Sequence, residues 1–182
     1  MTLHNRRSFA AQAGLLLAGL TAGMTKTAIA EQTPRPSGIS HSSAAIHQQI
    51  AFAAAPPRLY QALTIRFGEV VPLSAAMNSS MKLKLGTAPD KFDAKEGGAF
   101  SWFGGYVTGR NLELVPDTRI VQAWRAGSWD TGIYSIARFV LVARGESTLL
   151  VFDHTGFPSE AASHLAAGWY GNYWDPLAKF LA

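Results

Sequence analysis

The chain alternates between apolar and polar positions over residues 46–52, a pattern that predicts a strand. Every second position from Ile46 to Phe52 faces one side, and all of these are apolar except Gln48. The Pro56-Pro57 pair ends this strand and suits the first turn of a helix whose apolar face includes Leu59. A second short helix is expected between residues 67 and 81, interrupted by a proline.

From residue 92 onward, turn signals recur at intervals of one strand length. Gly-Gly, Pro-Asp, Asp-Thr-Gly and Arg-Gly-Glu sequences separate runs rich in β-branched and aromatic residues. We therefore expect antiparallel strands joined by short turns. The predicted strands are residues 99–103, 106–115, 119–126, 134–143 and 148–154.

The last part of the chain predicts a long amphipathic helix. Ser159 can cap its start, and Glu160 lies at its positive end. Every fourth residue from 165 to 177 is apolar, and two of these are aromatic, which gives the helix one aromatic-rich face. Pro176 is expected to kink this helix or to mark a break near its end.

This order of elements predicts an α+β domain. A strand, one or two helices, a run of strands and a long helix imply a curved antiparallel sheet with the helices gathered on one face. Such a sheet wrapped around a long C-terminal helix can enclose a cavity.

Composition and charge exclude several classes of function. The 182 residues are 48% hydrophobic and 15% charged, enough for a core in one domain, and no run is apolar enough to span a bilayer. Cysteine is absent, which excludes disulfides, zinc-thiolate sites and cysteine nucleophiles. Outside the first thirty residues 13 basic residues face 12 acidic ones, so we expect no nucleic-acid partner.

The first thirty residues read as an export signal. Arg6, Arg7 and Phe9 precede a weakly apolar stretch, and Ala28 and Ala30 form a small-residue cleavage motif. The segment resembles a twin-arginine signal peptide, although Asn occupies position 5 and Ala occupies positions 10 and 11, which differ from the usual motif. The alternatives are a Sec signal and a retained amphipathic leader.

The expected organisation follows from this leader. Residues 1–30 are assigned as the signal peptide, 31–43 as a disordered linker rich in Pro, Ser and Gly, and 44–182 as one domain. The mature chain would begin near Glu31, in the periplasm or outside the cell, after contact with the twin-arginine translocation machinery. That route exports folded proteins, so a ligand acquired in the cytoplasm could travel with the domain.

Several stretches of the domain match a known family in the family's order. They are residues 55–64, 97–100, 111–116, 119–125, 154–158, 168–169, 173–174 and 176–177. Through these stretches the domain resembles the SRPBCC or START-like superfamily, and within it the domain related to the activator of heat shock protein 90 ATPase. The resemblance implies a helix-grip fold whose cavity binds an apolar or amphipathic molecule in many relatives. A tryptophan that the family carries after its first helix is missing here, and the co-chaperone role does not transfer to an exported protein.

Aromatic residues of the second half are the candidate cavity walls. Strand parity and helical spacing place several rings on shared faces, and indole N–H and tyrosine O–H groups suit an amphipathic ligand. The alternative is that these rings only fill the core. The predicted walls are Trp102, Trp124, Phe139, Trp169 and Tyr173.

His154 is the candidate polar anchor of this cavity and a weak candidate catalytic residue. Strand parity turns it inward, and Asp153 is a neighbouring charged residue. The alternative is a histidine that only donates and accepts structural hydrogen bonds. The spacing of the histidines matches no metal-binding motif, and no phosphate loop or nucleophile elbow occurs, so neither a metal nor another cofactor is expected.

Three functions remain open from the sequence. The first is an exported domain that binds a small hydrophobic or amphipathic molecule. The second is an enzyme that uses the same cavity for acid-base chemistry of the cyclase, dehydratase or hydrolase type. The third is a protein-interaction module that uses the outer face of the sheet and holds no ligand.

Overall fold

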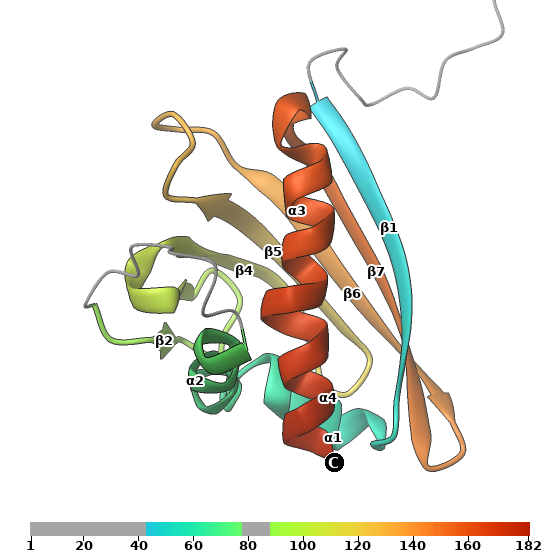
Figure 1. The fold of residues 1–182 in the computed structure, drawn as a ribbon. Helices are drawn as coiled ribbons and strands as arrows, with labels where there is room; N and C mark the ends of the chain where they lie inside the picture. The colour runs from blue at the N-terminus through green and yellow to red at the C-terminus, as the bar shows by residue number, and fades with distance from the viewer. Residues whose placement is uncertain (1–42, 78–87) are drawn as a thin grey trace, which may run out of the picture. The chain divides into compact units, whose positions relative to one another are not determined.

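One antiparallel sheet of seven strands forms the frame of the domain, and a long terminal helix runs across one face of it (Figure 1). This computed structural model describes residues 43–77 and 88–182. The predicted signal peptide, the predicted linker except for its last residue, and the end of the predicted second helix lie outside these residues. That last residue, Ser43, is the first residue of a strand. The expected α+β helix-grip arrangement is confirmed.

The strands follow the predicted order closely. Their sequence in the sheet is β1-β7-β6-β5-β4-β3-β2, so the first strand lies at one edge against the last, and every neighbour runs antiparallel. The strands are β1 (Ser43–Phe52), β2 (Lys91–Phe92), β3 (Ala99–Trp102), β4 (Val107–Val115), β5 (Arg119–Ala126), β6 (Ser135–Arg144) and β7 (Ser147–Pro158).

Alternating burial shows why these segments form a sheet with one covered face. Every second residue of β5 and most alternate residues of β7 are buried beneath the helices, as a period of two requires. β7 runs four residues past its predicted end, because β1 pairs with it as far as Pro158. Pairing with β1 therefore makes β7 longer than the alternation of apolar and polar residues predicts.

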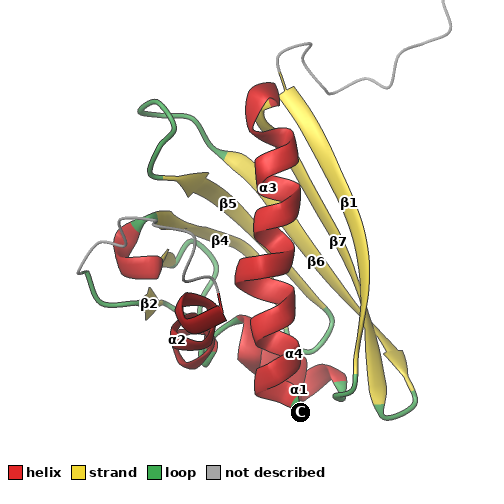
Figure 2. Ribbon diagram, in the orientation of Figure 1, coloured by secondary structure: helices red, strands yellow, loops and turns green. Residues whose placement is uncertain are grey.

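Two short helices connect the first strand to the rest of the sheet and lie beside the end of the terminal helix (Figure 2). α1 (Pro56–Leu63) begins at the predicted proline pair and buries Leu59 and Leu63. α2 (Phe67–Met77) confirms the second helix, with Pro72 inside it. Phe67 is fully buried, so α2 anchors its first turn in the core.

The terminal helix is continuous but not uniform. A 3-10 turn (Ser159–Ala161) leads into α3 (Ala162–Trp169), a π-helical turn (Tyr170–Trp174) and α4 (Asp175–Leu181). The expected Ser159 cap is wrong, because its side chain makes no capping hydrogen bond and the α-helix begins three residues later. Pro176 lies in the first turn of α4, where a missing N–H is tolerated, directly after the π turn.

Buried Gln48 of β1 ties the edge of the sheet to this irregular helix. Its amide nitrogen donates to the carbonyl of Ala166 at 3.1 Å, and its carbonyl oxygen accepts the indole N–H of Trp174 at 2.7 Å. The Tyr170 N–H, at the start of the π turn, donates to the carbonyl of Ala167, three residues earlier. Gln48, the polar residue in the predicted apolar face, therefore links β1 to the terminal helix through two hydrogen bonds.

Candidate functional site

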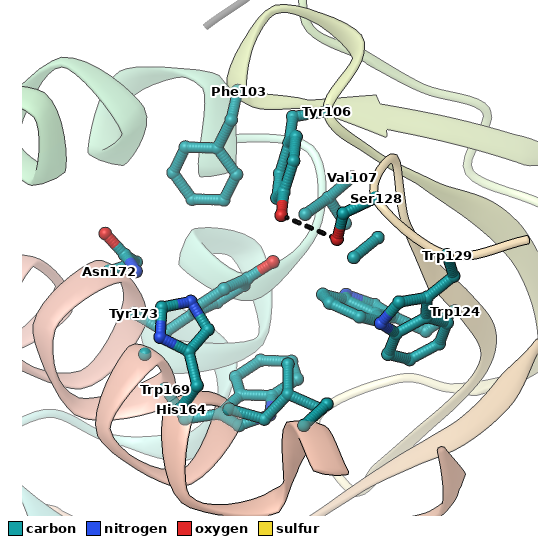
Figure 3. Close-up of a pocket in the computed structure, with 14 residues that line it drawn as sticks. Phe103, Tyr106, Val107, Trp124, Ser128, Trp129, His164, Trp169, Asn172 and Tyr173 are labelled. Carbon is teal, nitrogen blue, oxygen red and sulfur yellow. Dashed lines mark hydrogen bonds between the residues drawn. The ribbon is translucent and has the colours of Figure 1, made fainter. Parts of the chain in front are cut away.

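A pocket opens between the first half of the terminal helix and the sheet (Figure 3). Its volume is about 110 Å³, and it is bounded by the helix, by β4 and β5, and by the two loops that precede and follow these strands. The lining residues are Phe103, Tyr106, Val107, Trp124, Ala126, Ser128, Trp129, Ala161, His164, Leu165, Gly168, Trp169, Asn172 and Tyr173.

The helix supplies one wall through residues spaced three or four apart. Leu165, Gly168, Trp169 and Asn172 share one face of α3 and the π turn, as the helical period requires. Gly168 leaves this wall open, because a Cβ there would meet only the Asn172 amide, at 3.7 Å. The helix therefore has room at the pocket where a larger side chain would project.

The sheet supplies the opposite wall through Trp124 of β5. Its indole contacts Trp169 with 5.7 Å between ring centroids and Trp129 edge-on at 5.4 Å. Trp169 in turn contacts Tyr173 at 4.2 Å. Four large rings thus bound the pocket, and their contacts with one another keep them in place.

A strained turn positions Phe103 at the pocket. Phe103 adopts φ 55°, in the left-handed region that non-glycine residues rarely occupy, and Gly104 follows with φ 67°. Asp90 accepts hydrogen bonds from the backbone N–H groups of both residues. Burial raises the pKa of Asp90, and these hydrogen bonds oppose the rise. The turn that a Gly-Gly signal predicted therefore also places a wall residue.

Hydrogen bonds hold the loop after β5 beside the pocket. The Gly127 N–H donates to the carbonyl of Tyr106 at 2.7 Å, and the Tyr106 hydroxyl lies 3.1 Å from Ser128 Oγ. The guanidinium of Arg125 donates to the carbonyl of Trp129 at 2.7 Å. The pocket walls on this side are thus built before any ligand arrives.

Two buried polar atoms beside the pocket, Trp124 Nε1 and the hydroxyl of Tyr173, have no partner of ordinary hydrogen-bond geometry among the described residues, and neither is open to a water-sized molecule. The two residues are only 4% and 7% exposed. Burial raises the pKa of the Tyr173 hydroxyl above its usual range, a weak hydrogen-bonding interaction with Trp124 opposes part of this rise, and the charge of Asp90 adds to it. The hydroxyl stays protonated as a consequence.

The pocket lining contains no Asp, Glu, Lys or Arg. His164 lies at its exposed rim, and Asn172 is bound to α2 by a hydrogen bond from Ser74 Oγ to its side-chain oxygen at 3.2 Å. Apolar rings surround the interior, and polar groups stand at the rim. This distribution suits an uncharged molecule that buries an apolar part.

His154 lies behind the pocket wall rather than in the pocket. The Trp169 indole N–H donates to His154 Nδ1 at 3.0 Å, so the imidazole carries its proton on Nε2. That Nε2–H then donates to Ser135 Oγ at 2.6 Å, and the Ser135 hydroxyl donates to the carbonyl of Trp124 at 3.0 Å. Burial lowers the pKa of His154 to about 3.

This network gives His154 no role as a base toward Ser135. The nitrogen that faces the hydroxyl already carries a proton, and the other nitrogen accepts from an indole that donates only. His154 is also completely buried behind the rings of Trp124 and Trp169. The geometry matches the alternative of a histidine that satisfies structural hydrogen bonds.

The structure brings together three of the six predicted site residues. Trp124, Trp169 and Tyr173 line the pocket, whereas Trp102, Phe139 and His154 do not. Trp102 packs beneath α2 against Phe67, and Phe139 packs among the rings of the core. Asp153 lies on the outer face of the sheet, where it contacts His47 and Arg138.

Sequence reasoning missed the remaining lining residues for two reasons. Leu165 belongs to the predicted apolar stripe but was not assigned to the pocket, and Gly168 and Asn172 each lie one position before a stripe residue, so widening the stripe by that one position would have found them. Tyr106, Ser128 and Trp129 lie on turns and loops, which have no period. Their position depends on backbone hydrogen bonds that only the folded chain shows.

Two further features bear on the class of site. Over residues 43–77 and 88–182, no group of three or more His, Asp or Glu side chains is arranged to hold a metal ion. Within the same described part, no helix has the length and apolar character needed to cross a membrane.

Comparison with known proteins gives related sequences and a related fold. The human activator of 90 kDa heat shock protein ATPase homolog 1 is 26% identical over 154 residues, and the corresponding protein of Dictyostelium discoideum is 34% identical over 98 residues. These matches cover 85% and 53% of this chain, but 42% and 26% of those proteins. The chain thus spans less than half the length of these curated relatives.

The fold agrees with that of a solved relative. The crystal structure of an HSP90 activator from Plasmodium falciparum superimposes with a TM-score of 0.64 at 21% identity, over 75% of this chain and 95% of that one. Residues 75–182 match the family described as Activator of Hsp90 ATPase homolog 1-like protein. This match covers more than half of the chain and includes all of the pocket's lining residues. The chain therefore belongs to the Activator of Hsp90 ATPase homolog 1-like family.

Proposed function

We propose that this domain binds a small hydrophobic or amphipathic molecule in the pocket between the sheet and the terminal helix. The observation that carries the proposal is an aromatic pocket without charged side chains, whose walls are held in place by ring contacts and backbone hydrogen bonds. Transfer of the apolar surface of a ligand from water to such walls is favourable, which would drive binding.

Binding is favoured over catalysis by the chemistry of the described site. General acid-base catalysis needs a positioned group with access to the substrate. His154 has neither a free nitrogen nor an open side, and the hydroxyl of Tyr173 is held in its protonated form. The pocket can bury and orient a molecule, and that is the function we assign to it.

Gly168 allows a test that leaves every wall ring in place. Gly168→Leu should fill the pocket from the helix side and abolish ligand binding, and the helix should gain about 0.5–1 kcal/mol from the loss of glycine. Native mass spectrometry of the chain recovered from its own host, before and after denaturing extraction, should show a small-molecule adduct on the unaltered protein that Gly168→Leu lacks.

Gly168→Ala is the matched control. Its added Cβ makes an ordinary contact, so this variant should share the gain in stability and keep the adduct. An adduct that persists on Gly168→Leu would place the bound molecule elsewhere and would refute this pocket as the binding site.

We also propose that the domain is exported through the twin-arginine pathway. The support is the order of Arg6, Arg7 and Phe9, a weakly apolar stretch, and the Ala28 and Ala30 motif. Export would separate the domain from a cytosolic chaperone, so we do not extend to it the ATPase activation named in its relatives.

Replacing both Arg6 and Arg7 with Lys should stop export. The pathway depends on the arginine pair, so the expected result is an unprocessed chain in the cytoplasm, seen by cell fractionation and by the mass of the intact protein. The unaltered chain should appear outside the cytoplasm with a mass that fits cleavage near Glu31. Cleavage of the double variant near Glu31 would argue for a Sec signal instead, and an unaltered chain that keeps its first thirty residues would argue for a retained leader.

A further inference from the structure

Gln48 is the polar residue in the apolar face of β1, and it does not line the pocket. We infer that Gln48 is a positioning residue of the pocket. It fixes the π turn of the terminal helix against the sheet and thereby sets the affinity for the ligand. This inference rests on the proposed binding function and adds a residue that controls binding without touching the bound molecule.

The two hydrogen bonds of Gln48 lie on either side of the pocket-lining part of the helix. Figure 1 shows α3 running beside β1, the edge strand that carries Gln48. Ala166, whose carbonyl accepts from the Gln48 amide at 3.1 Å, comes two residues before Gly168. Trp174, whose indole N–H donates to the Gln48 carbonyl oxygen at 2.7 Å, is the last residue of the π turn. The lining residues between these two points are Gly168, Trp169, Asn172 and Tyr173.

The π turn determines where the lining residues point. Along a regular α-helix, a residue and the fourth one after it differ by about 40° around the axis, because one turn takes about 3.6 residues. Here the turn is wider, since the Asp175 N–H donates to the carbonyl of Tyr170, five residues earlier. A turn with more residues reduces that angular difference, so Trp169 and Tyr173 both face the pocket, with 4.2 Å between their ring centroids.

Pro176 explains why the helix widens at this point, but not where the helix lies on the sheet. In a regular α-helix the Pro176 ring would clash with the carbonyl of Asn172, four residues earlier, and Pro176 has no N–H to donate to it. A wider turn before the proline relieves this clash. These effects act within the helix alone. Bonds to another element must fix the position of the π turn relative to β1, and Gln48 supplies two of them.

The Trp174 ring connects Gln48 to the pocket wall. Trp174 is 1% exposed and stacks on Trp169 with 5.4 Å between ring centroids and 18° between ring planes. Gln48 is itself only 8% exposed, so its removal would leave the indole N–H of Trp174 unpaired in a site shielded from water. A shift of Trp174 in response would displace Trp169, which lines the pocket.

Gln48→Met tests the inference, because it keeps the length of the side chain and removes both hydrogen bonds. Gln122→Met is the matched control. Gln122 is also buried, at 4% exposed, its amide donates to Asn111 at 3.0 Å, and it does not line the pocket. Toluene is the probe, since a dry cavity of about 150 Å³ accepts benzene and this pocket has about 110 Å³. Its affinity for the full chain is measured by NMR titration that follows the Gly168 and Asn172 amides.

Only Gln48→Met should lose affinity for toluene. We expect binding about tenfold weaker than in the unaltered chain, because the walls formed by Trp169 and Tyr173 shift, and a displaced indole N–H resonance of Trp174. The Trp174 resonance is assigned from Trp174→Phe. Gln122→Met should keep the affinity, although urea unfolding should show comparable destabilisation of both variants. Equal affinity of Gln48→Met and Gln122→Met for toluene would overturn the inference.

Gln48→Glu separates the two hydrogen bonds from the shape of the side chain. A protonated carboxyl donates to the Ala166 carbonyl and accepts from Trp174, whereas an ionised carboxylate only accepts. Burial raises the pKa of a glutamate, so this variant should bind toluene like the unaltered chain at about pH 5.5 and about tenfold more weakly at about pH 9. The unaltered chain is the reference at each pH, because His154 on the neighbouring β7 and all other groups titrate in it alike. Equal affinity of Gln48→Glu at both pH values, relative to this reference, would contradict the role of the two bonds.

Failure of the inference differs from failure of the proposed function. Equal binding of toluene by the unaltered chain and all Gln48 variants removes only the role of Gln48 and leaves the pocket as a binding site. If the unaltered chain carries a native adduct but binds no toluene, the same variants are compared by the occupancy of that adduct, with the same expected order. If the unaltered chain binds no toluene and carries no adduct, both the proposed function and the inference fail.

Discussion

Trp169→Ala should lower the free energy of unfolding by about 3–5 kcal/mol, as expected when a large buried ring is removed. Trp169 is only 2% exposed and contacts Phe152 at 4.3 Å and Tyr173 at 4.2 Å between ring centroids. The change also leaves His154 Nδ1 without its donor in a buried site. Urea unfolding followed by circular dichroism measures the loss.

Trp169→Phe separates packing from hydrogen bonding. It keeps a ring in the core but removes the indole N–H, so the expected loss is about 1–3 kcal/mol, the cost of an unpaired buried acceptor. A loss below about 1 kcal/mol for Trp169→Ala would contradict the packing described for this ring. Because Trp169 supports the core as well as the pocket, a loss of ligand binding in Trp169→Ala would not by itself show that the ligand lies beside this ring.

Acid should destabilise the domain through His154 before it titrates the surface carboxylates. The unfolded chain protonates this histidine near pH 6.5, whereas burial lowers its folded pKa to about 3. The contribution of neutral His154 to the free energy of unfolding is therefore fully present above about pH 6.5 and is lost as the pH falls toward 3. By pH 5 the expected loss is about 2 kcal/mol, from roughly 1.4 kcal/mol per pH unit.

The pH window separates this effect from the titration of two carboxylates that form salt bridges. Arg66 and Arg119 hold the pKa values of Glu69 and Glu113 below their usual range, so these carboxylates stay charged between pH 7 and 5. Urea unfolding across this window should show the loss in the unaltered chain and a flatter profile in His154→Gln. His164→Gln makes the same replacement at an exposed position and serves as the control. A profile for His154→Gln as steep as that of the unaltered chain would refute the assignment to His154.

The buried polar network explains why residues that support the pocket are not themselves in it. His154 and Ser135 lie on neighbouring strands, β7 and β6, and connect Trp169 on the helix to the backbone of Trp124 on β5. Each of the three bonds has a defined donor and acceptor, so the network specifies how the two wall rings are held. Replacement of His154 should therefore affect the pocket by changing the positions of Trp124 and Trp169, because His154 itself does not line the pocket.

Period and turn chemistry predict most of the strands and helices in the described part of the chain, although the two-residue strand β2 was not predicted. Strands β3 to β7 lie within a few residues of the positions expected from alternation and glycine-containing turns, and α1 begins at Pro56-Pro57. These signals are local, because side-chain direction repeats every two residues in a strand and every 3.6 in a helix. The inward direction of His154 was predictable for the same reason.

The partners of these inward side chains could not be predicted in the same way. Parity places Trp102, Phe139 and Trp124 on the covered face alike, yet only Trp124 reaches the pocket, because α2 covers Trp102 and the second half of the terminal helix contacts Phe139 through Trp174. The π turn sets the direction of Tyr173. Local periodicity therefore decides which side chains point inward. The crossing of helices over the sheet decides which of these side chains are packed and which border an open space. This second outcome depends on contacts between residues far apart in the chain, which no local pattern contains.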